Sequence, residues 1–375
     1  MNSKNLQSLF TKYIEQFEFI NNQTNDENYK WAIARMFQND FDLESQNFAV
    51  MLEQIWKGTS NLIDNARQLP FFALVDYARR EPETVREMFR VLFQPDDGDL
   101  KARQARIEAF LAQTEVLRMK YFPDSWKYKN DQRSVMAYLF LHDPDENYLY
   151  KSTQAHEFAD CVEFYDDWGS GGNFKLDIYY RMCDELVKAM REYEPLMKTH
   201  RSRFDGHQSE YFEDRNLHIL AFDMIYTSQV YGLYNGIPYA HPNTQEKKLY
   251  LERMEKARSL QAEYDEAEKT AALLENAIKY LQSALTVGHT VTHKVFGAGT
   301  VAFIDSATVV VEFNKVGEKK FMLMDAFGKG FLSANEPELN DYIKQHLSVM
   351  VDANGISRRL KSAELALEPY IDILN

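Results

Sequence analysis

Residues 244–286 carry an apolar repeat that leaves little choice of structure. Apolar residues recur at alternating spacings of three and four, and the segment contains neither glycine nor proline. This spacing places the repeated residues on one stripe of a helix, as in a heptad repeat. It predicts one continuous helix of about 60 Å, at a rise of 1.5 Å per residue. The seam comprises Ala257, Leu260, Tyr264, Ala267, Ala271, Leu274, Ile278, Leu281 and Leu285.

An apolar seam of this length has to be covered, and two kinds of partner are open. The helix packs on its own protein or on an antiparallel neighbour, or the seam forms an intermolecular coiled coil and makes the chain a homodimer. The small residues Ala257, Ala267 and Ala271 permit close approach of a second helix, but they weaken an exposed two-stranded zipper. The sequence alone leaves both partners possible.

The periodicity changes on both sides of this helix. Residues 1–240 show one amphipathic helical pattern after another, whereas from Val287 apolar residues alternate with polar ones, which is typical of β-strands. We therefore expect a mainly α protein with a multi-helical N-terminal domain (1–240) and a long heptad helix (244–286). A small β-barrel or sheet (287–335) and C-terminal helices (336–375) would follow.

The glycines in "HKVFGAGTVAFID" pose the question of a phosphate-binding loop. Such a loop needs backbone N–H groups at the start of a helix, usually with a Lys and a Ser or Thr. Here a strand pattern follows, and no G-x-x-x-x-G-K-[ST] occurs in the chain. We expect Gly297, Gly299 and Gly317 to allow tight bends between strands instead. Nucleotide hydrolysis is therefore not expected.

Residues 287–332 carry a specific pattern of turn glycines, aromatic residues and alternating valines. It comprises Val291, His293, Phe296, Gly297, Gly299, Val301, Val311, Phe313, Gly317, Lys320 and Phe321. This pattern resembles the C-terminal Tudor-like (SH3-fold) domain of UvrD-type helicases, and the resemblance implies a five-stranded SH3/Tudor-like β-barrel that docks onto RNA polymerase, other proteins or duplex nucleic acid. The helicase motor is absent, so only an adaptor role transfers. We expect Lys294, Phe296, Lys320 and Phe321 to form the binding face and His293 to orient a turn.

Two motifs stand out within residues 30–235. They comprise Glu81, Pro82, Glu83, Val85, Arg86, Met88, Phe89, Leu92 and Phe93, then Tyr138 to Leu141, Pro144, Asp145 and Tyr148 to Lys151. With these motifs, residues 30–235 resemble the helical region that precedes the AAA+ motor of McrB-type restriction proteins. A heptad helix and a strand region take the place of the motor here, so the resemblance implies only recognition of DNA, modified bases or a partner protein.

Basic residues alternate with aromatic ones in two stretches of this region. Such side chains can hold phosphate and stack on a base, although Tyr and Trp on helices commonly belong to the core. The candidate contacts are Trp126, Lys127, Tyr128, Lys129, Arg133, Tyr148, Tyr150 and Lys151.

Charge and cysteine content narrow the function classes. The formal net charge is −14, which disfavours indiscriminate coating of nucleic acid and leaves protein partners or a local site. Two cysteines, Cys161 and Cys183, argue against a disulfide framework. The N-terminus has no signal pattern and no stretch reaches 18 apolar residues, so a cytoplasmic protein is expected.

One segment concentrates histidines and acids, but in no metal-binding pattern that we recognise. We interpret it as a charged loop and expect no metal, no cofactor and no catalytic residue. The leading hypothesis is a non-enzymatic adaptor of prokaryotic DNA metabolism or phage defence. The alternatives are an oligomer assembled through residues 244–286 and a divergent metal-dependent nuclease. The nuclease would use His200, Asp205, His207, Glu210, Asp214 and His218.

Overall fold

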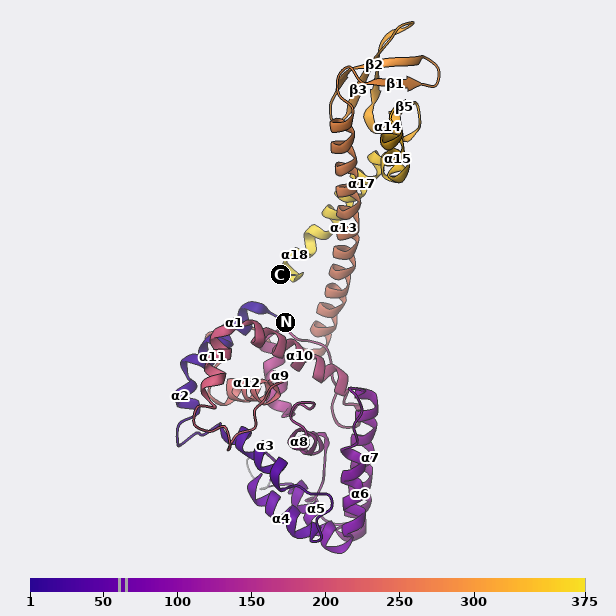
Figure 1. Ribbon diagram of the computed structural model, residues 1–375. Helices are drawn as coiled ribbons and strands as arrows, with labels where there is room; N and C mark the ends of the chain where they lie inside the picture. Colours follow the sequence, from indigo (N-terminus) through magenta and orange to yellow (C-terminus); the bar gives the residue numbers. More distant parts are fainter. Residues whose placement is uncertain (60–61, 65–66, 375) are drawn as a thin grey trace. The chain divides into compact units, whose positions relative to one another are not determined.

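The protein is mainly helical, with one small antiparallel sheet near the C-terminus (Figure 1). A computed structural model describes residues 1–59, 62–64 and 67–374. The chain forms two compact units, residues 1–248 (unit 1) and residues 249–375 (unit 2). No helix within these described ranges is long and apolar enough to cross a membrane.

Unit 1 consists of helices whose starts follow local sequence signals. Asp99 accepts hydrogen bonds from the backbone N–H groups of Lys101 and Ala102, and Asp131 forms a capping box with Ser134. Pro70 and Pro82 occupy first-turn positions, where no N–H is needed. The helices are α1 (Ser3–Glu15), α2 (Phe17–Ile20), α3 (Tyr29–Asp40), α4 (Phe48–Gly58), α5 (Pro70–Arg80), α6 (Pro82–Leu92), α7 (Leu100–Tyr121), α8 (Gln132–His142), α9 (Ser152–Cys161), α10 (Leu176–Glu192), α11 (Glu194–Ser202) and α12 (His218–Val230), with a 3₁₀ turn η1 (Gly171–Asn173).

Helix α8 lies at the centre of unit 1. Its residues from Ser134 to Leu141 are all buried, as expected for a helix that is apolar on every side. The following segment, 148–150, is buried as well, but it forms no strand. From Ser152 the chain is helical again.

A buried cluster of charges ties distant parts of unit 1 together. Lys30 Nζ lies 2.6 Å from Asp223 Oδ1 and also bonds Glu27, and its side chain has no exposed surface. Arg203 donates to Tyr13 Oη at 2.6 Å, and its guanidinium lies 3.7 Å from the centre of the Trp31 ring. Because a buried charge without a partner is costly, these side chains fix α1, α3 and α12 relative to one another.

Replacing Lys30 tests this cluster. K30M leaves Glu27 and Asp223 without their shared cation, and we expect a loss of about 3–5 kcal/mol in the unfolding free energy of unit 1. K57M, at an exposed lysine paired with Glu53, is the control and should cost at most about 1 kcal/mol. All four tryptophans lie in unit 1, so urea unfolding followed by tryptophan fluorescence reports on this unit. Equal losses in the two variants would contradict the assignment.

Unit 2 combines most of one long helix with a five-stranded antiparallel sheet. The strand order is β4-β3-β2-β1-β5. The elements are α13 (Thr244–Ala284), β1 (Thr290–His293), β2 (Gly297–Ile304), β3 (Thr308–Phe313), β4 (Gly317–Met322), α14 (Leu323–Gly328), β5 (Leu332–Ala334), α15 (Pro337–Gln345), α16 (Leu347–Val351), α17 (Ala353–Leu367), η2 (Glu368–Tyr370) and α18 (Ile371–Leu374).

The sheet is open, which corrects the expectation of a closed β-barrel. Strands β4 and β5 lie at the two ends of the strand order, and no pairing joins them within the described part of the chain. The short helix α14 connects them and packs against β3, β4 and β5.

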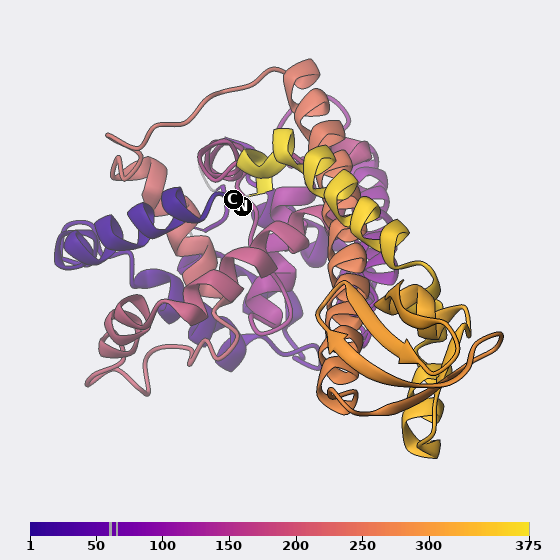
Figure 2. The same ribbon diagram turned by 90° about the horizontal axis from the view of Figure 1, so that it is seen from above.

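The apolar seam of α13 is largely buried inside unit 2. Leu274, Leu281 and Leu285 belong to the core that includes the sheet, and Ala257 and Leu260 are buried nearer the start of the helix. Helix α17 runs alongside α13 (Figures 1 and 2), and the two line a groove of about 350 Å³. An antiparallel neighbour from the same chain therefore covers much of the seam; an intermolecular coiled coil stays a prediction.

Gly299 is required by packing, not by a turn. It lies within β2, opposite Phe313, and a Cβ atom at this position would lie 2.6 Å from the Phe313 ring and 2.7 Å from Val311. Gly297, two residues earlier, has φ of 76° and open space around it, so it serves the backbone conformation instead.

The variant G299V should destabilise unit 2. Overpacking against Phe313 and Val311 predicts a loss of about 2–3 kcal/mol. A298V, at the neighbouring exposed position, is the matched control and should change stability by less than about 0.5 kcal/mol. Hydrogen exchange of the β2 and β3 amides measures both effects, and unchanged protection in G299V would refute the packing role.

Candidate binding face of the C-terminal sheet

The turn between β1 and β2 is organised by one imidazole. His293 ends β1, and its Nδ1 accepts hydrogen bonds from the backbone N–H groups of Val295 (3.0 Å) and Phe296 (3.2 Å). Accepting at Nδ1 requires a neutral ring that carries its proton at Nε2. Gly297 then takes the left-handed conformation that leads into β2. The side chain of His293 thus holds the turn in place.

An aromatic cluster supports this turn. The rings of His293 and Phe296 stack with centroids 4.4 Å apart, and Phe321 lies 5.3 Å from His293. Phe313 contacts all three rings from the core side. Phe296 and Phe321 are therefore half-buried and fixed in orientation, with part of each ring left accessible.

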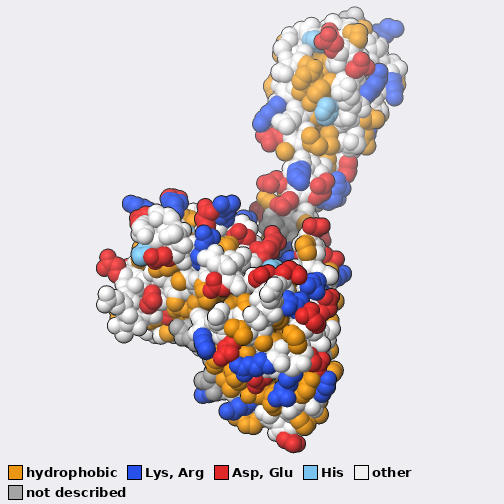
Figure 3. All heavy atoms as spheres, turned by 60° about the horizontal axis from the view of Figure 1, so that its bottom comes forward, with side chains coloured by type: hydrophobic (Ala, Val, Ile, Leu, Met, Phe, Trp, Pro, Cys, Tyr) orange, Lys and Arg blue, Asp and Glu red, His pale blue; other side chains and the backbone are white. Residues whose placement is uncertain are grey.

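The turn presents an exposed apolar tip. Val295 is 80% exposed and Phe331 is 45% exposed. The backbone N–H of Lys294 donates to Phe331 O, which holds the two segments side by side. We call Lys294, Val295 and Phe331 the apolar tip. Figure 3 shows hydrophobic side chains at the surface of unit 2 with Lys and Arg side chains near them.

Val295 and Phe331 are not among the residues predicted to form a binding face. Their only sequence signal is a large apolar residue close to a turn glycine: Val295 lies two residues before Gly297, and Phe331 directly follows Gly330. Such a residue becomes informative only when the fold shows that no neighbouring element covers it.

Strand β4 divides the four residues expected to form one binding face. Phe321 pairs with the buried Val309, whereas Lys320 pairs with Val310, and adjacent residues of a strand point to opposite faces. Phe321 therefore joins Phe296 at the aromatic cluster, and Lys320 lies on the opposite face of the sheet. The expectation of a single face containing both is corrected by this register.

The first basic and aromatic stretch of unit 1 is partly exposed. Trp126 is 69% exposed, with Lys127 Nζ 5.7 Å from its ring centre. Lys129 is exposed, while Arg133 forms an ion pair with Asp131 at 2.5 Å. Tyr128 packs against Phe72 and Phe122 and is held from two sides. Trp126, Lys127 and Lys129 remain available for contact with another molecule.

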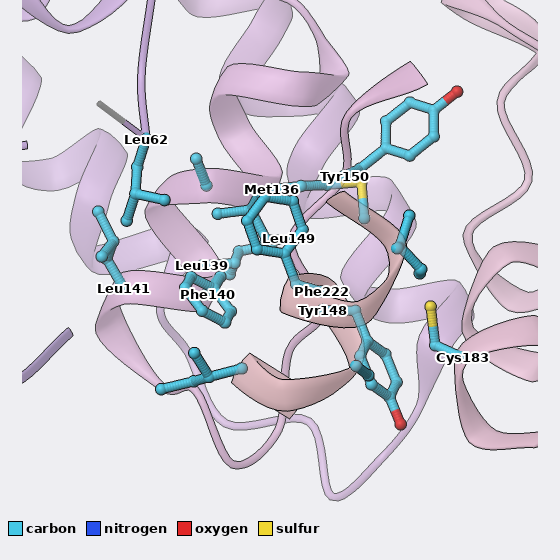
Figure 4. Close-up of a cluster of buried hydrophobic side chains, with 14 of the residues drawn as sticks. Leu62, Met136, Leu139, Phe140, Leu141, Tyr148, Leu149, Tyr150, Cys183 and Phe222 are labelled. Carbon is cyan, nitrogen blue, oxygen red and sulfur yellow. The ribbon is translucent and has the colours of Figure 1, made fainter. Parts of the chain in front are cut away.

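The second stretch is not available. Tyr148 and Tyr150 are buried, and Figure 4 shows their rings on opposite sides of Leu149 within the hydrophobic cluster. Tyr148 Oη donates to Asp184 at 2.7 Å, and Lys151 Nζ donates to Leu62 O at 2.8 Å. Burial lowers the pKa of Lys151. These side chains stabilise the core, which corrects the prediction that they contact phosphate and bases.

The histidines and acids expected as an alternative metal site do not converge. His207 pairs with Glu210 at the surface, and Asp205 is exposed. His218 packs at a tilt against Tyr148, whereas His200 packs against Trp31 and Phe204. No group of three or more potential ligands among residues 1–59, 62–64 and 67–374 has the arrangement of a metal site.

Two members of this set are buried next to each other. His200 Nε2 lies 3.9 Å from Asp214 Oδ2. Burial, with repulsion from Arg203 and Arg201, lowers the pKa of His200 to about 3. Burial raises the pKa of Asp214 to about 7, although the N–H groups of Ile219, Leu220 and Trp31 donate to its carboxylate.

Comparison of the chain with protein-family models, with curated proteins and with solved structures found no match. The two resemblances described above therefore rest on their motif residues.

The buried imidazole of His200 predicts a specific pH dependence. In the unfolded chain a histidine binds its proton near pH 6.5, but His200 in the folded chain binds it only near pH 3. Between these values the unfolded state binds more protons, so stability falls as the pH is lowered. From pH 7 to pH 5 the free energy of unfolding should fall by about 2 kcal/mol more in the wild type than in H200N.

Urea unfolding monitored by tryptophan fluorescence at the two pH values measures this difference. H207N serves as the control because it removes an exposed histidine and retains His200, so its loss between the two pH values should match that of the wild type. A loss in H200N as large as in the wild type would show that His200 is protonated in the folded state.

Proposed function

We propose that this chain is a non-enzymatic adaptor that docks a protein partner through the apolar tip and the free edge of β4. The observation that carries the proposal is the exposed Val295, held beside Phe331 by the His293 turn. Large apolar side chains on a rigid support are typical anchors of protein interfaces. The pathway, prokaryotic DNA metabolism or phage defence, follows from the two resemblances.

The edge of β4 suggests the shape of the partner. One side of β4 pairs with β3, and its other side has no strand partner among the described residues. Residues 317–320 are exposed, and in the described part of the chain neither Lys319 nor Lys320 forms an ion pair within 4 Å, although the charge of Lys320 helps to lower the pKa of Asp305. An extended segment that adds to this edge would gain main-chain hydrogen bonds, and acidic side chains on it would meet the lysines.

Charge favours a protein partner over duplex nucleic acid. Residues 287–335 contain five lysines, no arginine and four carboxylates, so this region is nearly neutral. Binding to duplex relies on neutralising several phosphates at once, which needs a strongly basic surface. The resemblance to the Tudor-like domain also supports docking, because that family uses the domain to hold other macromolecules. In unit 1, the exposed Trp126 and Lys127 support a separate target-recognition contact.

The alternatives receive less support. Much of the α13 seam is buried inside unit 2, which leaves less of it for a second copy. The histidines of the nuclease alternative lie in separate surroundings.

A negative charge at the apolar tip should weaken docking. We would select binders to the full chain from a displayed library of 12-residue peptides, and we expect alternating apolar and acidic residues among them. V295E should weaken the selected peptides at least about ten-fold, since it adds a buried charge to the interface. V116E is the matched control, because Val116 is 67% exposed but lies in unit 1.

Isothermal titration calorimetry of the wild type and both variants gives the affinities. Equal weakening in V295E and V116E would point to a non-specific charge effect, and retained binding in V295E would place the docking surface elsewhere. Either result contradicts the proposal.

A further inference from the structure

Unit 1 contains a cavity that the adaptor proposal does not use. It has a volume of about 590 Å³, within the range of small-molecule sites. Residues from α3, α11 and the connection between α11 and α12 line it, including the aromatic side chains Phe204 and Tyr211. Two residues of the connection, Asp214 and Leu217, have left-handed backbone conformations that are uncommon for residues other than glycine. Strain of this kind is often retained at binding sites.

The buried lining of this cavity includes a polar pair with unused capacity. His200 and Asp214 both line it, and both side chains are more than nine-tenths buried. The imidazole of His200 makes no hydrogen bond to another described residue, and its Nδ1 is fully shielded without a partner. The 3.9 Å between Nε2 and Asp214 Oδ2 is too long for a hydrogen bond. One oxygen atom at about 2.8 Å from each would bridge them, and a hydroxyl can both accept and donate.

The lining also gathers positive charge, which is notable in a chain with a net charge of −14. Arg35, Arg201 and Arg215 all line the cavity, together with one exposed carboxylate, Glu213, which pairs with Arg215. Arg201 and Arg215 each pair with one exposed carboxylate, and no carboxylate pairs with Arg35 within the described residues. A guanidinium has five N–H donors, so these arginines keep donors for an anion, and phosphate suits their geometry.

We infer that this cavity binds a phosphate ester of a hydroxylated molecule, either a sugar phosphate or a nucleotide. The phosphate lies against the arginines, and a hydroxyl bridges His200 and Asp214. The rings of Phe204 and Tyr211 provide the apolar wall, against which a sugar or a base packs. This site lies wholly in unit 1 and does not depend on the docking of a protein by unit 2.

Isothermal titration calorimetry of the full chain tests the inference with three probes: ribose 5-phosphate, adenosine 5′-monophosphate and inorganic phosphate. We expect at least one ester to bind at least about ten-fold more tightly than inorganic phosphate, since only the esters offer a hydroxyl. If ribose 5-phosphate binds more tightly than adenosine 5′-monophosphate, the cavity is a sugar-phosphate site. If adenosine 5′-monophosphate binds more tightly, it is a nucleotide site.

The variant R35E should weaken the bound ester at least about ten-fold, because it replaces an exposed donor with a charge that repels phosphate. K101E makes the same charge change at an exposed lysine outside the lining, and its affinity should stay within about two-fold of the wild type. Arg35 is exposed, so R35E should fold, and the circular dichroism spectrum checks this. The inference is overturned if no ester binds, if phosphate binds as tightly as the esters, or if R35E and K101E behave alike.

Discussion

The candidate docking site depends on one hydrogen-bonding constraint. Two backbone N–H groups in the turn after β1 have no strand partner, and a single imidazole nitrogen of His293 accepts both. The same ring stacks on Phe296 and lies against Phe321, so one side chain fixes both the path of the turn and the aromatic cluster under it. These hydrogen bonds and ring contacts hold the turn in place, so Val295 is already positioned before a partner arrives. Little conformational entropy is then lost on binding, as in other pre-organised interfaces.

Unit 1 is held together by a different kind of constraint. Lys30 and Arg203 bring two positive charges into the interior, where Asp223 and Glu27 compensate them. Such clusters add little net stability compared with an apolar core, but they penalise any arrangement that separates the partners. The cluster joins the connection after α2, helix α3 and the region around α11 and α12. The strained connection beside the cavity of His200 and Asp214 lies in that same region.

The sequence predicted the broad architecture because periodicity is a local property. The heptad spacing of residues 257–281 falls within the single helix α13, with the last seam residue, Leu285, directly after its end, and the two-residue period after Val287 matches the five-stranded sheet. The sequence could not show that β4 and β5 stay unpaired and leave the sheet open. It could not place Lys320 and Phe321 on opposite faces, since that depends on strand register. Nor could it distinguish the buried Tyr148 from the exposed Trp126, because both are aromatic residues near lysines and only tertiary packing separates them.

Hydrogen–deuterium exchange of the full chain, with and without a selected peptide, tests the central claim most directly. If the partner docks on the His293 turn and the edge of β4, exchange should slow in residues 293–297 and 317–322, while residues 126–133 of unit 1 are unaffected. Slower exchange in residues 126–133 alone, with no change in the turn or in β4, would contradict the account.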